Sequence, residues 1–125
     1  MELTVNHLAP YLPYGLKLQY VVREKVEKIG AMKSISHNED ETHPTRVSIS
    51  AMYNEEHIWM FKPLLKSMSR LDKENIVKLK LFVEADKQYL IDNPLNCCYD
   101  DLQYLLSEHY DVFGLIPAGL ATELS

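Results

Sequence analysis

Cysteine is scarce in this chain of 125 residues: there are two, Cys97 and Cys98, and they are neighbours. Adjacent cysteines reach disulfide geometry with each other only under strain. They also lack the spacing of a CxxC redox pair or of a zinc knuckle. This usage predicts a protein of a reducing compartment, in which at least one of the two cysteines packs as a small apolar residue.

Long hydrophobic runs are missing as well. No stretch approaches the roughly 18 apolar residues of a transmembrane helix. The N-terminus, MELTVNHLAP, has no basic region followed by an apolar run, so it does not have the pattern of a signal peptide. We therefore expect a cytoplasmic protein that makes no membrane contact.

Recognisable motifs of catalysis, metal binding or cofactor binding are also absent, so we expect no enzyme and no cofactor. What is present is the composition of a globular domain, with 46% hydrophobic and 25% charged residues. A chain of this length fits one domain, here residues 1–125, and buries enough surface for a single core.

The N-terminal half has the period-two alternation of strands. Asn6 is a suitable N-cap for a short helix over 7–12, which two prolines keep short. Apolar and polar residues then alternate over 16–22, 26–36 and 47–53. Three strands between about 16 and 53, joined by polar links, predict an antiparallel meander with one apolar face.

The C-terminal half has helical spacing. Pro63 suits the first position of a helix, and four apolar residues follow at the positions of one helix face: Leu64, Leu65, Met68 and Leu71. The strongest helix prediction covers 99–110, whereas 74–83 fits either a helix or a strand. The expected fold is therefore α+β, a small three-stranded antiparallel meander covered by helices from about 63–110 and followed by a C-terminal turn.

Three blocks of the sequence carry a resemblance. They are HLAPYLPYGLK at 7–17, FKPLLKSMSRL at 61–71 and LLSEHYDVFGLIPAGLATE at 105–123. In these blocks, about a third of its length, the chain resembles a family of short, uncharacterised proteins from prophages and other mobile elements of gut bacteria. The resemblance implies a phage-related origin and a shared fold. It supplies no reaction, ligand or site residue.

Charge is unevenly distributed along the chain. The net charge is −5, yet residues 62–83 carry six Lys or Arg and two Asp or Glu. On a helix, the spacing of four of these cations would place them on one face: Lys62, Lys66, Arg70 and Lys73. Such a face would contact phosphates or an acidic partner. The alternative is the solvated side of an amphipathic helix.

Two groups of titratable residues could in principle carry chemistry. The loop 37–43 holds two imidazoles and three carboxylates that could bind a cation: His37, Glu39, Asp40, Glu41 and His43. Cys97 and Cys98 precede a helix N-terminus, which favours a thiolate, and would need His57 or His109 as a base. For both groups we favour the simpler interpretation, a hydrophilic connection and a packed pair of thiols.

The helix predicted at 99–110 contributes a third such group. Glu108 and Asp111 are spaced to share a face, with His109 on the apolar side. We expect a structural role for all three residues.

Aromatic residues give the remaining candidates. Tyr11 and Tyr14 lie at one end of the chain, and Trp59 and Phe61 flank Met60 in the middle. Tyrosine and tryptophan are enriched at protein interfaces. Packing in the core is the alternative.

The leading hypothesis is therefore an accessory protein that acts through a protein–protein interaction, with an unknown partner or a second copy of itself. The alternative is a nucleic-acid-binding accessory protein that uses the basic face at 62–73, which the negative net charge disfavours. The candidate interaction residues are Tyr11, Tyr14, Trp59, Phe61, Lys62, Lys66, Arg70 and Lys73.

Overall fold

The alternating residues of the N-terminal half form strands. In the computed structural model, which describes residues 2–42, 44–71 and 87–124, β1 (Lys17–Val22), β2 (Lys25–His37) and β3 (Thr45–Ile49) pair antiparallel in chain order. Gly15 precedes β1 with φ at +62°, a left-handed conformation that glycine adopts without strain.

The sheet does not stop at three strands. β4 (Glu56–His57) pairs antiparallel with β3, and β5 (Phe61–Leu65) pairs antiparallel with β1. β6 (Thr122–Glu123) adds to β5 in parallel, so the order is β4-β3-β2-β1-β5-β6. The prediction of a three-stranded meander covered by helices is therefore wrong: the protein has a six-stranded mixed sheet with few, short helices.

The helix expected to begin at Pro63 is a strand. Phe61, Pro63 and Leu65 are buried and alternate with less buried residues, which is the period of a strand. Between the end of β5 and residue 71, the chain makes a single turn of 3₁₀ helix, η3 (Met68–Arg70). The segment 74–83 lies outside the described residues.

The helices are short. At the N-terminus α1 (Val5–Leu8) runs into the 3₁₀ helix η1 (Ala9–Tyr14), and η2 (Ile58–Met60) joins β4 to β5. Further along the chain are α3 (Lys87–Asp92), η5 (Pro94–Asn96) and α4 (Tyr99–Ser107). The expected N-cap was Asn6, but the cap is Thr4, whose amide donates to Nδ1 of His7 at 3.1 Å. In the described residues we find no helix of the length and apolarity that crossing a bilayer requires.

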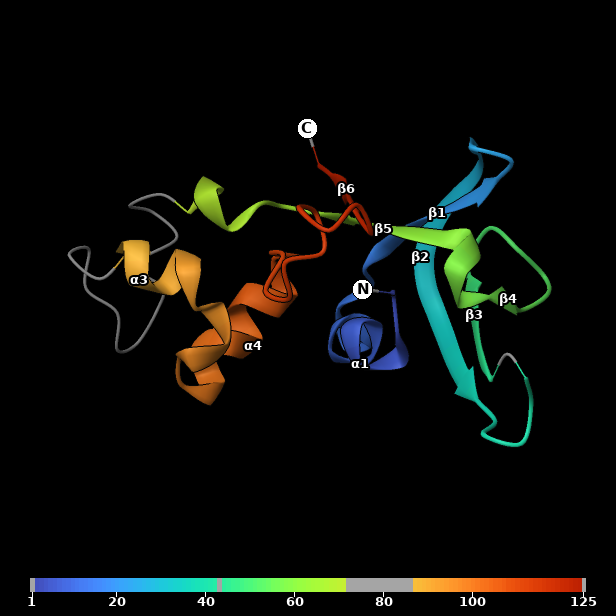
Figure 1. Ribbon diagram of the computed structural model, residues 1–125, viewed down its shortest axis with the longest axis horizontal. Helices are drawn as coiled ribbons and strands as arrows, with labels where there is room; N and C mark the ends of the chain where they lie inside the picture. Colours follow the sequence, from blue (N-terminus) through green and yellow to red (C-terminus); the bar gives the residue numbers. More distant parts are fainter. Residues whose placement is uncertain (1, 43, 72–86, 125) are drawn as a thin grey trace.

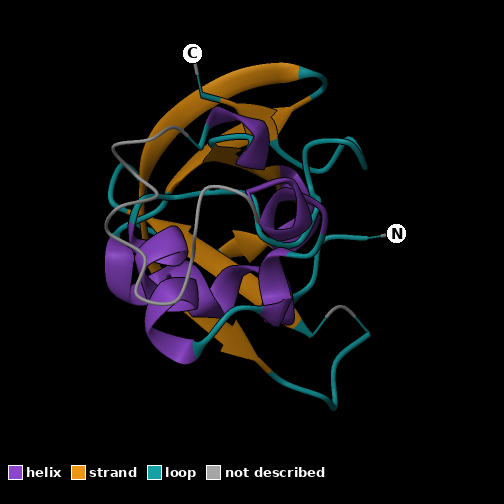
Figure 2. Ribbon diagram, turned by 90° about the vertical axis from the view of Figure 1, so that its left-hand side faces the viewer, coloured by secondary structure: helices purple, strands orange, loops and turns teal. Residues whose placement is uncertain are grey.

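Most of the helical segments gather on one side of the sheet (Figures 1 and 2). The core lies between them and the sheet's inner face. Its largest fully buried side chains are Tyr11, Phe61, Leu8, Leu16, Leu18, Ile49, Leu65, Leu71, Leu105, Leu106, Leu115 and Val47.

Backbone hydrogen bonds join the C-terminal segment to the end of β5 and to the residue that follows it. The amide of Lys66 donates to the carbonyl of His109, and the amide of Asp111 donates to the carbonyl of Lys66, both at 2.8 Å. The amide of Leu124 donates to the carbonyl of Leu65, also at 2.8 Å. These bonds bring residues 109–124 beside β5, and with them one wall of the groove described next.

Candidate functional site: an exposed tryptophan between two grooves

Trp59 is the one tryptophan of the chain, and 57% of it is exposed. It lies on η2, the single turn that links β4 to β5. Because η2 contacts both β1 and β3, its backbone is held by two parts of the sheet. The indole stacks on the ring of His57, with 4.2 Å between ring centroids and 7° between planes. This packing restricts the orientation of the exposed ring.

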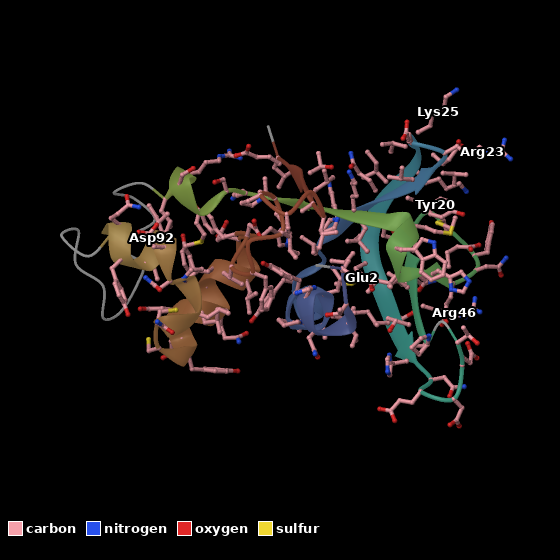
Figure 3. All side chains as sticks on the ribbon, in the orientation of Figure 1. Glu2, Tyr20, Arg23, Lys25, Arg46 and Asp92 are labelled. Atoms are coloured by element: carbon pink, nitrogen blue, oxygen red, sulfur yellow. The ribbon has the colours of Figure 1, made fainter. Side chains whose placement is uncertain are left out.

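An apolar groove of about 520 Å³ opens on one side of Trp59. Its walls come from three separate parts of the chain: the N-terminal segment, η2 with the start of β5, and the C-terminal turn. The lining residues are Glu2, Leu3, Ile58, Trp59, Phe61, Lys62, Gly119 and Leu120. Figure 3 shows Glu2 between the N-terminal helix and the sheet.

The two charged residues of this groove, Glu2 and Lys62, are exposed. Neither makes an ion pair within the described part of the chain. Lys62 lies on β5 opposite Gln19 of β1, which places it on the outer face of the sheet. The groove therefore combines an apolar floor with a carboxylate and an ammonium group that form no ion pair among the described residues.

A second groove, of about 650 Å³, shares Trp59 with the first. It is more polar and runs between the start of the chain and the loop that connects β2 to β3. Glu2, Leu3 and Ile58 line both grooves. Trp59 thus stands on the ridge between two concave surfaces.

The four aromatic candidates differ in how far their side chains are exposed. Tyr11 and Phe61 are buried in the core, with 0% and 2% exposed, so neither ring offers a surface to a partner. Tyr14 is half-buried, and its hydroxyl donates to Oε1 of Gln103 at 2.5 Å. Trp59 is the candidate whose ring is largely exposed.

The expected basic helix face does not exist, because Lys62 and Lys66 belong to β5 and the residue after it. Lys66 pairs with Glu108 at 3.5 Å and lies 5.4 Å from the ring centroid of Tyr110. Arg70 donates from Nη1 to the carbonyl of Leu124 at 2.5 Å. Lys73 lies outside the described residues.

The loop 37–43 does not assemble a metal site in the described residues, where no cluster of three or more ligating side chains is found. His37 instead bonds through Nδ1 to the hydroxyl of Thr45 at 2.7 Å, and Glu41 pairs with Arg46 at 3.7 Å. His43 lies outside the described residues.

The cysteine pair is a structural feature. Cys97 donates from Sγ to the carbonyl of Pro94 at 3.2 Å. Burial, followed by the negative charge of Asp101, raises the pKa of the Cys97 thiol. The expectation that the helix N-terminus favours a thiolate is therefore wrong for Cys97. Cys98 is half-buried at the N-cap position of α4.

Glu108, His109 and Asp111 do not converge on one site. His109 has φ at +63°, and its Nε2 donates to the carbonyl of Tyr14 at 2.8 Å. Asp111 is buried, and its two carboxylate oxygens accept from the amides of Leu115 and Ile116 at 2.8 and 2.9 Å. These bonds hold the C-terminal turn in place.

Sequence reasoning missed both grooves, although it identified Trp59. Leu3 and Leu120 lie 117 positions apart in the sequence yet line the same groove. No local pattern connects them, because the groove depends on how the two ends of the chain pack against β5. Comparison with protein-family models, with curated proteins and with solved structures finds no match for this chain.

Proposed function

We propose that this protein is a non-enzymatic, phage-related accessory protein that acts by binding another protein at the Trp59 ridge. The carrying observation is the indole of Trp59, which is stacked on His57 and largely exposed between two grooves. A tryptophan held in one orientation loses little side-chain entropy on binding. Central, well-packed tryptophans are also the residues that most often dominate the binding energy of an interface.

The chemistry of the grooves indicates the kind of partner. Leu3, Ile58 and Leu120 provide an apolar floor that would take an apolar side chain of the partner. Lys62 and Glu2 lie beside that floor with no ion pair within the described residues, so each can meet an opposite charge on the partner. We therefore infer a polypeptide partner that inserts an apolar residue flanked by charged residues.

The test is affinity capture from lysate of the source cell at low salt, with and without nuclease, by three versions of the protein. These are the wild type, Trp59→Ala and Tyr53→Ala. Tyr53 is a matched control because it is also aromatic and is fully exposed, but does not line either groove. We expect a stoichiometric protein partner with the wild type and Tyr53→Ala, regardless of nuclease, and its loss with Trp59→Ala. Capture that is equal for all three would refute the proposal.

The fluorescence of Trp59 offers a second readout with the purified partner. Because this is the one tryptophan of the chain, its emission reports on the ridge alone, provided that the partner is made free of tryptophan. Burial by the partner should shift the emission to shorter wavelength and reduce quenching by acrylamide. An unchanged spectrum in a saturated complex would place the interface elsewhere.

A further inference from the structure

The two grooves beside Trp59 differ in charge. Among the described residues that line the second groove there is no Lys or Arg, whereas Glu2 and Glu39 both line it. Both of these side chains are exposed, and neither forms an ion pair within the described part of the chain. Glu2 also lines the apolar groove. The side of the ridge that faces the second groove is therefore acidic.

Other titratable groups near the second groove have contacts of their own. In the loop from β2 to β3, Glu41 pairs with Arg46 at 3.7 Å, so the nearby guanidinium group is shared with a different carboxylate. His37 lines the groove, and its Nδ1 bonds to the hydroxyl of Thr45 at 2.7 Å. The net charge of the chain is −5. A positive charge on the partner is therefore the one that complements this groove.

The indole of Trp59 favours the same choice. His57 stacks on one face of the ring, with 4.2 Å between centroids, and 57% of the tryptophan is exposed. An ammonium or guanidinium group over the exposed part of an indole gains cation–π attraction. The stem of a Lys or Arg can lie along the ring while its charged head extends past it. A basic side chain that crosses Trp59 would thus contact the ring on its way to the carboxylates.

The residues shared by the two grooves limit the spacing of the partner's side chains. Leu3, Ile58 and Trp59 line both grooves, so the grooves lie on either side of the same few residues. An extended segment advances about 3.3 Å per residue. Side chains two to four positions apart are therefore separated by roughly 7–13 Å, which spans a ridge of this kind.

We propose that the segment recognised at the Trp59 ridge is basic, with a Lys or Arg roughly two to four positions from its apolar residue. The apolar side chain packs on Ile58 and Leu120 in the apolar groove, and the basic side chain crosses Trp59 to meet Glu2 and Glu39. An acidic segment would instead bring like charges together in the second groove. This partner class rests on the proposed function, since it presupposes that the Trp59 ridge is the binding surface.

The test is a selection from a displayed library of random peptides of about 12 residues, which reach roughly 40 Å when extended. Peptides that bind the wild type are passed over immobilised Trp59→Ala, and those that the variant does not retain are sequenced. We expect these peptides to combine an apolar residue with a Lys or Arg at the stated spacing more often than the unselected library, beyond sampling error.

A synthetic copy of one selected peptide then tests the carboxylates, with fluorescence anisotropy as the measurement. Glu39→Lys should raise its Kd about fivefold or more, because repulsion replaces an exposed ion pair. A peptide whose basic residue is replaced by Glu should bind Glu39→Lys more tightly than it binds the wild type. Glu24→Lys is the control: it changes the net charge equally, lines neither groove, and should bind the selected peptide like the wild type.

The outcomes distinguish this partner class from the proposed function itself. Peptides that depend on Trp59 but show no enrichment of Lys or Arg would overturn the basic segment and leave the ridge as a binding surface. Equal affinity of the selected peptide for the wild type and for Glu39→Lys would overturn it as well. Failure to select any peptide that depends on Trp59 would contradict both proposals. Should Glu39→Lys not fold, Glu2→Lys provides the same test at the other carboxylate.

Discussion

At the scale of single residues, Tyr11 has a structural role: its hydroxyl joins two distant parts of the chain. Its ring is fully buried, and its hydroxyl donates to the carbonyl of Tyr110 and accepts from the amide of Val112 at 3.3 Å. The hydroxyl therefore joins the N-terminal 3₁₀ helix to the C-terminal segment, 99 positions along the chain. That link sets the position of the turn that forms one wall of the apolar groove.

We predict that Tyr11→Phe lowers the free energy of unfolding by about 1–2 kcal/mol, because a buried carbonyl and a buried amide lose a partner. The ring contact with Phe113, at 6.2 Å between centroids, can persist in the variant. Urea denaturation measures the effect, with the fully exposed Tyr53→Phe as control. Equal stability of Tyr11→Phe and wild type would contradict this role.

The same substitution should change the alkaline limit of stability. Burial, and to a smaller extent the charge of Asp111, raises the pKa of Tyr11 well above its usual value, against the opposing effect of the Val112 hydrogen bond. The unfolded chain releases this proton above a pH of about 10 while the folded chain keeps it, so stability falls by about 1.4 kcal/mol per pH unit there. Tyr11→Phe should show a shallower fall above pH 10 and the same slope as wild type below pH 9. The raised pKa of Tyr20 acts in both proteins, so the difference between them reports Tyr11.

At the scale of elements, the sequence predicted strands better than helices. The alternation over 16–22 and 26–36 corresponds to β1 and β2, although the first five residues of β2 are all exposed. β5 was mistaken for a helix start because Leu64, Leu65, Met68 and Leu71 have helical spacing. The pattern that indicates a strand is the alternation of the buried residues Phe61, Pro63 and Leu65. The pairing of β5 with β1 stabilises the strand over a helix.

Other elements had no local signal. β6 is two residues long and exists because β5 offers it a free edge. The apolar groove depends on contacts between the two ends of the chain, and the second groove on contacts between the N-terminal segment and the loop from β2 to β3, so both follow from tertiary packing. The predicted helix at 99–110 is confirmed for Tyr99–Ser107, where the helical pattern is longest within the described residues.

The close approach of β2 to the loop after β3 gives a prediction at this scale. A Cβ atom on Gly30 would lie 2.9 Å from Oγ of Ser50 and 3.0 Å from the amide nitrogen of Ala51. The second contact is with backbone, so the loop would have to move. We expect Gly30→Ala to lower the free energy of unfolding by about 1–3 kcal/mol.

Thermal denaturation would test this, with Gly30→Ala/Ser50→Ala as the informative companion. Removing Oγ relieves the side-chain contact and leaves the backbone contact, so the double variant should recover only part of the loss. Full recovery would show that the serine hydroxyl alone sets the spacing. A stable single variant would show that β2 and the loop are farther apart than 3.0 Å implies.

At the scale of the whole molecule, the described cations of the basic segment lie in different surroundings. The basic segment from residue 62 meets the acidic C-terminal half directly: Lys66 pairs with Glu108, and Arg70 binds the carbonyl of Leu124. Lys62 lies on another part of the surface, in the apolar groove. The net charge of −5 also disfavours the attraction of nucleic acid.

We therefore predict no steep, salt-dependent binding to duplex or single-stranded DNA. Four cations that each neutralised one phosphate would give a slope of about −3 to −4 in a plot of log affinity against log salt. Fluorescence anisotropy of labelled oligonucleotides between about 50 and 300 mM salt measures this slope. A slope near −3 that is lost in Lys62→Ala/Arg70→Ala would restore the nucleic-acid hypothesis in spite of the missing helix face. A flat response would favour the proposed Trp59 ridge over the basic residues as the binding surface, because Lys66 and Arg70 are already engaged within the fold.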